Sequence, residues 1–282
     1  MTALGRSLDS SGAIQKVVLI TGASSGIGKV CAEHLSARGY HVFGAQRRVP
    51  AAGDHRAVEM IAMDVDDDRS VELGVRGIVE KAGHIDAVIN CAGNAWMGAI
   101  EDTSIAEAKA QLETNFFGVL RVCRAVLPAM RRQGGGHIVN ISSLAGVLGL
   151  PFSGLYSASK FALEGMSESL RLETRRHGVK VVLIEPGDFR SQLAVTRRTV
   201  NGTESNDTYR AAFEKFKLTQ EKDEAGAPTP EPVALLVEQI LRNPSPKLRY
   251  SVGMLGQRIV VPLKRLLPQA LFEWVLCRAL AL

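Results

Sequence analysis

The chain is poor in cysteine and in aromatic residues, and it contains no long apolar run. Its four cysteines (Cys31, Cys91, Cys123 and Cys277) show neither C-x-x-C pairing nor the spacing of metal ligands, so we expect a reduced, intracellular setting. No uncharged apolar stretch reaches the ~20 residues that span a bilayer, and residues 1–12 lack the apolar core of a secretory signal. The sequence therefore predicts a cytoplasmic protein that is soluble or at most peripherally bound to a membrane.

Charged residues are common but mixed in sign. The sequence holds 34 Lys and Arg against 29 Asp and Glu, which gives a formal net charge of +5. The basic residues are dispersed and form neither a long run nor a nucleic-acid-binding motif, so no nucleic-acid partner is expected. The six histidines lack ligand spacing, so no metal site is expected either. A hydrophobic content of 46% is ordinary for a globular chain with one large core.

Segments typical of strands and of helices alternate along the chain. The alternation predicts an α/β fold, a single-domain Rossmann-type doubly wound parallel sheet with helices on both faces. In such folds the ligand binds beyond the carboxyl ends of the strands. The expected strands lie near 16–21, 41–46, 57–62, 86–90, 137–142, 179–184 and 247–252, and the expected helices near 27–38, 68–82, 104–132, 155–176 and 231–242.

A glycine-rich turn joins the first expected strand to the first expected helix. Glycines there let the backbone bend tightly and approach a pyrophosphate, whose charge suits exposed N–H groups and the positive end of a helix. The spacing is G-x-x-x-G-x-G, and glycines of this kind also form ordinary tight turns. The predicted nucleotide contacts in this turn are Gly22, Ser24, Ser25, Gly26, Ile27 and Gly28.

Tyr156 and Lys160 stand four residues apart in another expected helix. Side chains with this spacing project from the same helix face. A free phenol titrates near pH ~10, and a cation beside it favours the phenolate. We therefore expect Lys160 to lower the pKa of Tyr156 toward the range where a phenol donates and accepts a proton. Taken alone, the same spacing is also found where the tyrosine only packs against the core and the lysine is only solvated at the end of a helix.

Together these motifs resemble the classical, single-domain branch of the short-chain dehydrogenase/reductase family, over about residues 16–191. The N-A-G segment of the family is similar to Asn90-Cys91-Ala92-Gly93, in which Cys91 replaces a common second asparagine, and its P-G turn is similar to Pro186-Gly187. Counting thirteen positions back from the tyrosine selects Ser143 rather than Ser142. The catalytic Asn, Ser, Tyr and Lys of the family correspond to Asn115, Ser143, Tyr156 and Lys160.

The resemblance implies an oxidoreductase in which a hydride passes between the nicotinamide and a carbonyl or alcohol carbon. It assigns proton transfer to Tyr156, contact with the substrate oxygen to Ser143 and contact with the nicotinamide ribose to Lys160. Asn115 would hold the water of a proton relay, although it also suits a residue that merely holds its own helix backbone. A homodimer or homotetramer is implied. The further implied cofactor contacts are Asn90, Ala92, Gly93, Tyr156, Lys160, Pro186 and Gly187.

The end of the second expected strand indicates which nicotinamide cofactor binds. A carboxylate there would hydrogen-bond an unphosphorylated ribose, but Gln46 occupies the position. Arg47 and Arg48 follow and offer planar cations that suit a 2′-phosphate, and a solvated surface pair would have the same sequence. We expect NADP(H) to be preferred and NAD(H) to be accepted. The resemblance further places Asp64 and Val65 beside the adenine.

The substrate is constrained least. The segments 150–155 and 161–165 resemble 17β-hydroxysteroid and retinol dehydrogenases, which implies a small apolar alcohol, ketone or aldehyde that is steroid-like or retinoid-like. General packing of the family would give the same residues. The segment 188–231 is expected to be a substrate loop that acts as a lid.

We expect three regions in the chain: a flexible N-terminus (1–12), the dinucleotide-binding catalytic domain (13–255) and an amphipathic C-terminal extension (256–282). A basic amphipathic helix rests on a membrane, covers an apolar pocket, or packs on its own domain or a subunit partner, and the sequence leaves these open. Pro262 and Pro268 are expected to break the extension into short pieces.

Two other classes of protein use parts of the same pattern. A cofactor-sensing protein would keep the glycine turn, yet it has no need of Ser143, Tyr156 and Lys160 together. An epimerase or dehydratase uses similar Tyr and Lys chemistry, usually with a larger substrate domain. The oxidoreductase interpretation explains more of the residues than either alternative.

Overall fold

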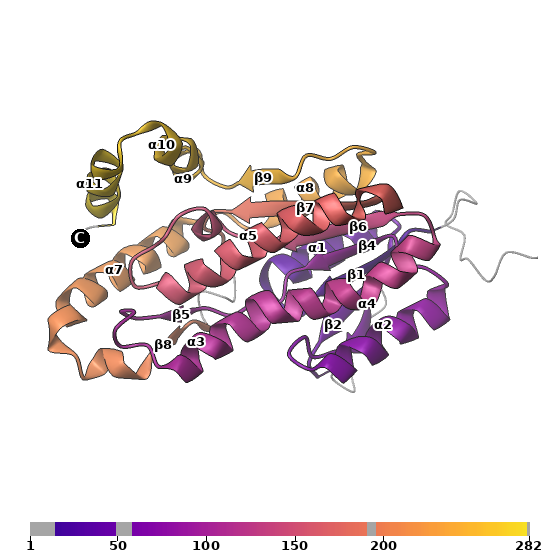
Figure 1. The fold of residues 1–282 in the computed structure, drawn as a ribbon, viewed down its shortest axis with the longest axis horizontal. Coiled ribbons are helices and arrows are strands. Elements are labelled where there is room, and N and C mark those ends of the chain that lie inside the picture. Colours follow the sequence, from indigo (N-terminus) through magenta and orange to yellow (C-terminus); the bar gives the residue numbers. More distant parts are fainter. Residues whose placement is uncertain (1–14, 49–57, 191–195, 281–282) are drawn as a thin grey trace, which may run out of the picture.

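The computed structural model of the chain describes residues 15–48, 58–190 and 196–280 (Figure 1). Seven parallel strands form one sheet in the order β3-β2-β1-β4-β6-β7-β9, which confirms the predicted doubly wound fold. The strands are β1 (Val17–Thr21), β2 (His41–Gln46), β3 (Glu59–Ala62), β4 (Ala87–Asn90), β6 (Gly136–Ile141), β7 (Val179–Pro186) and β9 (Arg249–Val252).

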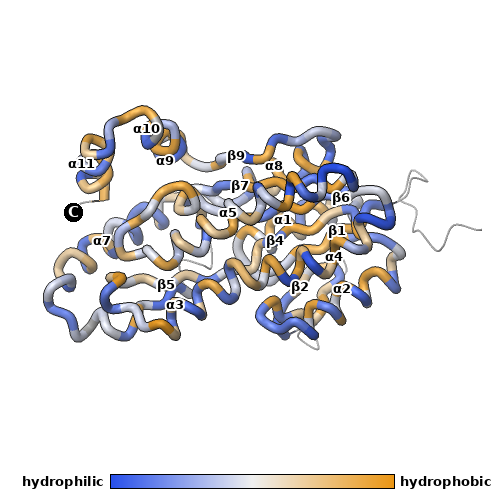
Figure 2. The backbone as a smooth tube through the Cα atoms, viewed as in Figure 1, coloured by the Kyte–Doolittle hydropathy of each residue, from blue (hydrophilic) through white to orange (hydrophobic). Residues whose placement is uncertain are grey.

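Helices cover both faces of the sheet (Figure 1). Along β1, Val17 and Leu19 belong to one apolar cluster while Val18 and Ile20 belong to the other, because successive side chains of a strand point to opposite faces. Apolar residues accordingly run along the strands between the helices (Figure 2). One face is covered by α2 (Asp68–Ala82), α4 (Val119–Arg132) and α5 (Gly154–Thr174), and the other by α1 (Gly26–Ala37) and α8 (Glu231–Arg242).

The helix expected over 104–132 is divided. It consists of α3 (Ile105–Leu112), a π-helical turn (Glu113–Gly118) and α4. The turn was not predicted, because one extra residue moves the later apolar positions along the sequence by a single place, a change too small to stand out in the pattern of one sequence.

The segment expected to be a substrate loop contains regular structure. The described part holds β8 (Arg198–Thr199), which pairs with β5 (Trp96–Met97), a 3₁₀ turn (Asn201–Glu204) and the long helix α7 (Asp207–Gly226). Phe213 and Phe216 on α7 are buried against Met97, which anchors this helix to the rest of the domain. These two phenylalanines are the buried side chains of α7, and the rest of its sequence is mostly polar. The helix therefore lacks the broad apolar stripe by which a helix is predicted from sequence.

The extension forms three short helices, α9 (Leu255–Arg258), α10 (Val260–Leu266) and α11 (Gln269–Ala279). Pro268 separates α10 from α11 as expected. Pro262 lies in the first turn of α10 and has no N–H to donate to the carbonyl oxygen of Arg258, and α9 ends at that residue. The expected flexible N-terminus lies outside the described residues. In the part of the chain that the structure describes, no helix combines the length and apolarity needed to cross a membrane.

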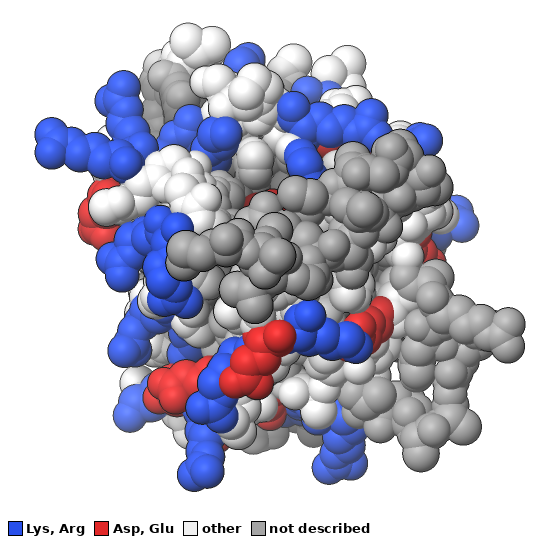
Figure 3. Space-filling view, turned by 90° about the vertical axis from the view of Figure 1, so that its right-hand side faces the viewer, with Lys and Arg blue, Asp and Glu red and all other residues white. Residues whose placement is uncertain are grey.

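The strands point toward α7 and the C-terminal helices (Figure 1). The nucleotide and catalytic motifs follow the carboxyl ends of β1, β4, β6 and β7, so they gather at that end of the sheet. Figure 3 shows the opposite end of the molecule, where Lys and Arg are scattered over the surface with acidic side chains between them.

Candidate active site

The turn between β1 and α1 is shaped by glycine. Gly22 and Gly26 have φ angles of 67° and 52°, in the left-handed region that favours glycine. A Cβ on Gly28 would lie 2.4 Å from the carbonyl oxygen of Gly22, and one on Gly22 would lie 2.9 Å from the backbone of Ala92. Side chains at these positions would push the turn away from the loop after β4, so the close approach requires glycine.

The amino end of α1 is open to an anion. Ser25 is the N-cap residue, but its side chain makes no capping hydrogen bond, whereas Asp67 caps α2 and Ser104 caps α3. The first N–H groups of a helix have no partner within the helix, and the helix dipole adds positive potential there. The open turn and its uncapped helix fit the pyrophosphate of a dinucleotide.

The loop after β4 is fastened to the same turn. The Thr21 hydroxyl accepts hydrogen bonds from the backbone N–H of Cys91 at 3.0 Å and of Ala92 at 3.1 Å. The Asn90 side chain is buried within the sheet and donates to Asn140 Oδ1 at 2.8 Å. Only the backbone of Asn90 is therefore available to a nucleotide. The predicted cofactor contact of Asn90 is thus limited to its backbone, and it stays a prediction.

The structure brings Ser143, Tyr156 and Lys160 together. The Lys160 ammonium lies 5.8 Å from the centre of the Tyr156 ring and donates to the carbonyl oxygen of Ile141 at 2.9 Å. The Tyr156 hydroxyl is hydrogen-bonded to Ser143. Ser142 is buried beside Gly146, and Ser143 is the serine that interacts with the phenol, so the count of thirteen positions selected the serine that contacts the tyrosine.

The titration of the pair differs from the sequence argument. Burial raises the pKa of Tyr156 above its usual value, against a smaller opposing effect of the hydrogen bond with Ser143. Burial also lowers the pKa of Lys160 to about 8. The expectation that the pKa of Tyr156 falls is therefore wrong for the protein without cofactor, because it counted the neighbouring cation and left out desolvation.

Asn115 lies in the π-helical turn and its side chain is fully buried. The amide Nδ2 donates to the carbonyl oxygen of Asn94 at 3.0 Å and to Ser159 Oγ at 3.1 Å, while Oδ1 accepts from the Asn94 N–H at 2.9 Å. Asn115 therefore clamps the loop after β4 onto α5. Its part in a proton relay stays a prediction.

Four further residues near the phenol have charges or polar groups that the sequence did not single out. Asp188 directly follows the Pro-Gly turn, and its pKa is raised by burial and by nearby Glu224. Gln257 donates to Asp188 Oδ2 at 2.6 Å and accepts from its N–H at 2.9 Å. Arg197 forms an ion pair with Glu224. The positive charge of Arg197 lowers the pKa of Tyr156, whereas the negative charge of Asp188 raises it. Adjacency to the Pro-Gly motif could have pointed to Asp188, but nothing in the sequence pointed to the others.

Comparison with known proteins decides the family. A model of the short chain dehydrogenase family matches residues 16–201. The chain belongs to this family. It is 39% identical over 261 residues to the 3-ketodihydrosphingosine reductase of Bacteroides thetaiotaomicron, covering 93% of this chain and 96% of that one. As a member of the family, the chain is a dehydrogenase/reductase enzyme.

Solved structures of short-chain dehydrogenases share the fold. One from Streptomyces avermitilis is 33% identical with a TM-score of 0.79, covering 92% of this chain and 96% of that one. A metagenomic short-chain oxidoreductase solved in complex with NADP is 28% identical with a TM-score of 0.67, covering 84% and 96%. The agreement supports the family assignment across almost the whole chain.

The residues predicted to contact the adenosine end of the cofactor follow β2 and β3. Gln46 ends β2, and Arg47 and Arg48 follow it as exposed side chains. Val65 is buried against Gly118, so only its outer surface is available for packing. The arginines stand where the sequence argument required a phosphate partner, and their role remains a prediction.

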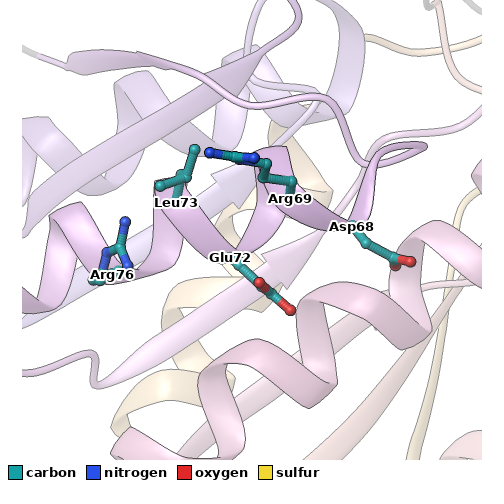
Figure 4. A pocket seen from close by; sticks show the side chains of 5 residues that line it. All are labelled: Asp68, Arg69, Glu72, Leu73 and Arg76. Atoms are coloured by element: carbon teal, nitrogen blue, oxygen red, sulfur yellow. The ribbon is translucent and has the colours of Figure 1, made fainter.

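A hollow on α2 is separate from this site. It is lined only by exposed side chains of that helix, none of which belongs to the catalytic or glycine motifs (Figure 4). The lining residues are Asp68, Arg69, Glu72, Leu73 and Arg76.

The C-terminal extension reaches the active-site loops. Besides the Gln257 contacts, Lys264 donates to the carbonyl oxygen of Val147 at 2.7 Å and lies over the ring of Phe161 at 5.3 Å. Leu280 packs against the apolar cluster that includes Phe213. The extension therefore contacts its own domain beside the loops that follow β6 and β7.

Proposed function

We propose that the chain is an NADP(H)-dependent oxidoreductase that interconverts a secondary alcohol and a ketone, or an alcohol and an aldehyde, on an apolar substrate. The observation that carries the proposal is the contact of Ser143, Tyr156 and Lys160 at the end of the sheet that also holds the uncapped glycine turn. Sensor and epimerase functions do not account for this contact together with the family assignment.

The choice of NADP(H) rests on the end of β2. Gln46 offers no carboxylate to repel a 2′-phosphate, and two exposed guanidinium groups follow it. The metagenomic relative is described in complex with NADP, which supports the same choice. NAD(H) is expected to bind more weakly because the arginines then have no phosphate to contact.

Each residue of the contact has a distinct task in this proposal. The bound nicotinamide supplies or accepts the hydride. Tyr156 donates a proton to the substrate oxygen during reduction and removes it during oxidation, and Ser143 donates a hydrogen bond to the same oxygen as negative charge develops. Lys160 holds the nicotinamide ribose and, as a cation, favours the phenolate form of Tyr156.

The substrate is proposed to be a long-chain ketone with an amino group next to the carbonyl. The Bacteroides relative is named for 3-ketodihydrosphingosine, which is such a molecule. The carboxyl group of Asp188 raises the pKa of Tyr156, so it places a negative charge on the phenol's side of the site, where it would attract an ammonium group on the substrate. Phe152 is half-buried at the edge of the buried cluster of Met97, Phe213 and Phe216, and its exposed part offers apolar surface to the chain. Steroid-like and retinoid-like substrates are apolar alternatives without the amino group.

The extension is proposed to contact a membrane peripherally. Arg258 and Arg278 are exposed on it and suit anionic lipid headgroups. A membrane would also deliver an apolar substrate to the adjacent active site. The exposed apolar side chains from the start of α9 to the end of α11 are Leu255, Ile259, Leu266, Leu271 and Trp274.

The reaction is tested by following absorbance at 340 nm with NADPH or NADH against a long-chain amino ketone, the same ketone without the amine, a steroid ketone and retinal. Turnover with NADPH that Tyr156→Phe abolishes, with NADPH binding kept, is expected. NADPH binding without turnover on any substrate would instead support a sensor. Asp188→Asn should lower kcat/KM for the amino ketone at least ~10-fold more than for the plain ketone, since both substrates share its effect on Tyr156 and only the amino ketone loses a close charge pair.

The membrane proposal is tested by co-sedimentation with vesicles that contain anionic lipid. The double variant Leu255→Glu with Ile259→Glu should lose binding, while Leu172→Glu, on an equally exposed apolar residue of α5, should keep it. Failure of the unmodified protein to sediment would contradict the proposal. Light scattering on the same preparation distinguishes the proposed homodimer or homotetramer from a monomer.

A further inference from the structure

Two oppositely charged side chains are buried one turn apart on α5. Lys160 and Glu164 are 7% and 5% exposed, which is rare for such residues unless they are paired. They have the i, i+4 spacing that places side chains on the same helix face. The loop after β6 packs against both, since a Cβ on Gly146 would lie 3.3 Å from Lys160 Cβ and 3.2 Å from Glu164 Cγ.

Glu164 also belongs to a group of charges behind the active site. Arg249, on β9, donates from Nε to Glu164 Oε2 at 2.8 Å, and the same nitrogen lies 3.4 Å from Glu185 Oε1 at the end of β7. Ser251 donates to Glu185 Oε2 at 2.7 Å. A third carboxylate, the exposed Glu168, contacts Arg249 Nη2 at 2.5 Å. One guanidinium thus contacts three carboxylates, so the carboxylates outnumber it and net negative charge remains around Glu164.

We propose that Glu164 is a positioning residue that keeps the buried Lys160 protonated in the pH range where the enzyme works. The inference rests on the role proposed above for Lys160 and adds the residue that maintains its charge. Glu164 acts through Lys160 and contacts neither substrate nor cofactor in this assignment.

The other groups around Lys160 cannot supply the same charge. Cys91 faces it from the loop after β4, but burial raises the pKa of that thiol to about 12, so it is uncharged near neutral pH. Tyr156 is a neutral phenol there, because burial raises its pKa as well. The Ile141 carbonyl contributes a dipole only. Among the described residues around the lysine, Glu164 is therefore the anion that opposes desolvation, which by itself lowers the pKa of Lys160.

The pKa of Glu164 is itself set by opposing effects. Burial raises its pKa, and the carboxylate of Glu185 adds to this effect. Ser142 and Arg249 oppose it, and Arg249 is shared with Glu168. A purely structural role, in which Glu164 only anchors β9 through Arg249, would be shared in part by Glu168 and would leave the titration of the active site unchanged.

The experiment compares the pH dependence of kcat/KM in the full-length protein with that of Glu164→Gln, with Glu168→Gln as the matched control that removes the other α5 partner of Arg249. In Glu164→Gln, Lys160 loses its proton at lower pH, so the alkaline limb should move down by about one pH unit. Glu168→Gln should keep the wild-type profile. Glu164→Asp, which retains the charge, should restore the limb toward its original position.

The pH dependence of the NADPH dissociation constant, measured by fluorescence, provides a second readout. It should shift in the same direction in Glu164→Gln, and it separates failure of this inference from failure of the proposed reaction, since it requires no substrate. Profiles that superimpose for the wild type and Glu164→Gln, or equal shifts in both glutamine variants, would overturn the proposal. If circular dichroism shows that Glu164→Gln is unfolded, Glu185→Gln replaces it: this variant removes the carboxylate that raises the pKa of Glu164, so Glu164 stays ionised and the alkaline limb should stay at or above its wild-type position, and a downward shift would overturn the proposal.

Discussion

Replacing Lys160 with methionine should stabilise the protein near neutral pH while it removes activity. Burial lowers the pKa of Lys160 from 10.5 to about 8. The unfolded chain therefore holds this proton more tightly than the folded chain does. The pKa of Lys160 is about 2.5 units lower in the folded chain, and each unit corresponds to about 1.36 kcal/mol. At pH values below about 8 the buried charge therefore lowers the free energy of unfolding by about 3 kcal/mol.

The methionine side chain has a similar length and no charge, so the variant avoids this cost. It also loses the hydrogen bond from the ammonium to Ile141, which is worth about 1 kcal/mol. We expect Lys160→Met to be more stable than the wild type by about 2 kcal/mol at pH 7. The wild type regains stability as pH rises from about 8 toward 10.5, so the order should reverse at the alkaline end.

Urea denaturation of both proteins without cofactor at pH 7, 8, 9 and 10 measures the difference. Lysines and tyrosines that lie away from position 160 titrate equally in both proteins and cancel. Lys29→Met, at an exposed position of α1 with a 3.8 Å surface ion pair, should change stability by less than about 0.5 kcal/mol at every pH. A Lys160→Met variant that is less stable at pH 7, or a difference that does not change with pH, would refute the reasoning.

Three other perturbations test separate parts of the structure. Replacing Arg47 and Arg48 with alanine should raise KM for NADPH at least ~10-fold and leave KM for NADH unchanged, so an unaltered ratio of the two contradicts the phosphate assignment. Burial lowers the pKa of His137 to about 4, so the wild type should lose stability as pH falls from 6.5 toward 4, and His137→Gln should lose less, as urea midpoints at pH 7 and 5 would reveal. Gly28→Ala places a Cβ 2.4 Å from a backbone oxygen and should weaken NADPH binding at least ~10-fold by fluorescence titration, whereas Gly77→Ala, which meets nothing within 4 Å, should bind NADPH normally.

The architecture followed from local pattern because its elements are locally determined. Each central strand is a short apolar run that ends in a turn-forming or polar residue, and α2 and α8 begin and end where the pattern predicts, at 68–82 and 231–242. The contact between Ser143 and Tyr156 was predictable by resemblance, since both residues follow from motif spacing.

The features that the sequence did not reveal depend on tertiary contacts. The π-helical turn exists where Asn115 binds both the backbone of Asn94 and a hydroxyl of α5, a combination with no local signature. Gln257 contacts Asp188 from a segment far away in the chain. Arg197 is nearer in sequence, but it belongs to no recognisable motif. The pKa of Tyr156 depends on how deeply the phenol is buried, which spacing on a helix does not report.

The contacts of the extension affect how the protein should be handled. Gln257 holds both the backbone and the carboxylate of Asp188, and Lys264 holds the loop that carries Ser143 through Val147. A purification tag or fluorescent protein attached after residue 282 would pull on these same hydrogen bonds. The described part of the chain begins just before β1, whose first residue lies at the opposite end of the sheet from the catalytic residues (Figure 1). Kinetic work should therefore use amino-terminal tags, because a carboxyl-terminal fusion could be mistaken for a poor enzyme.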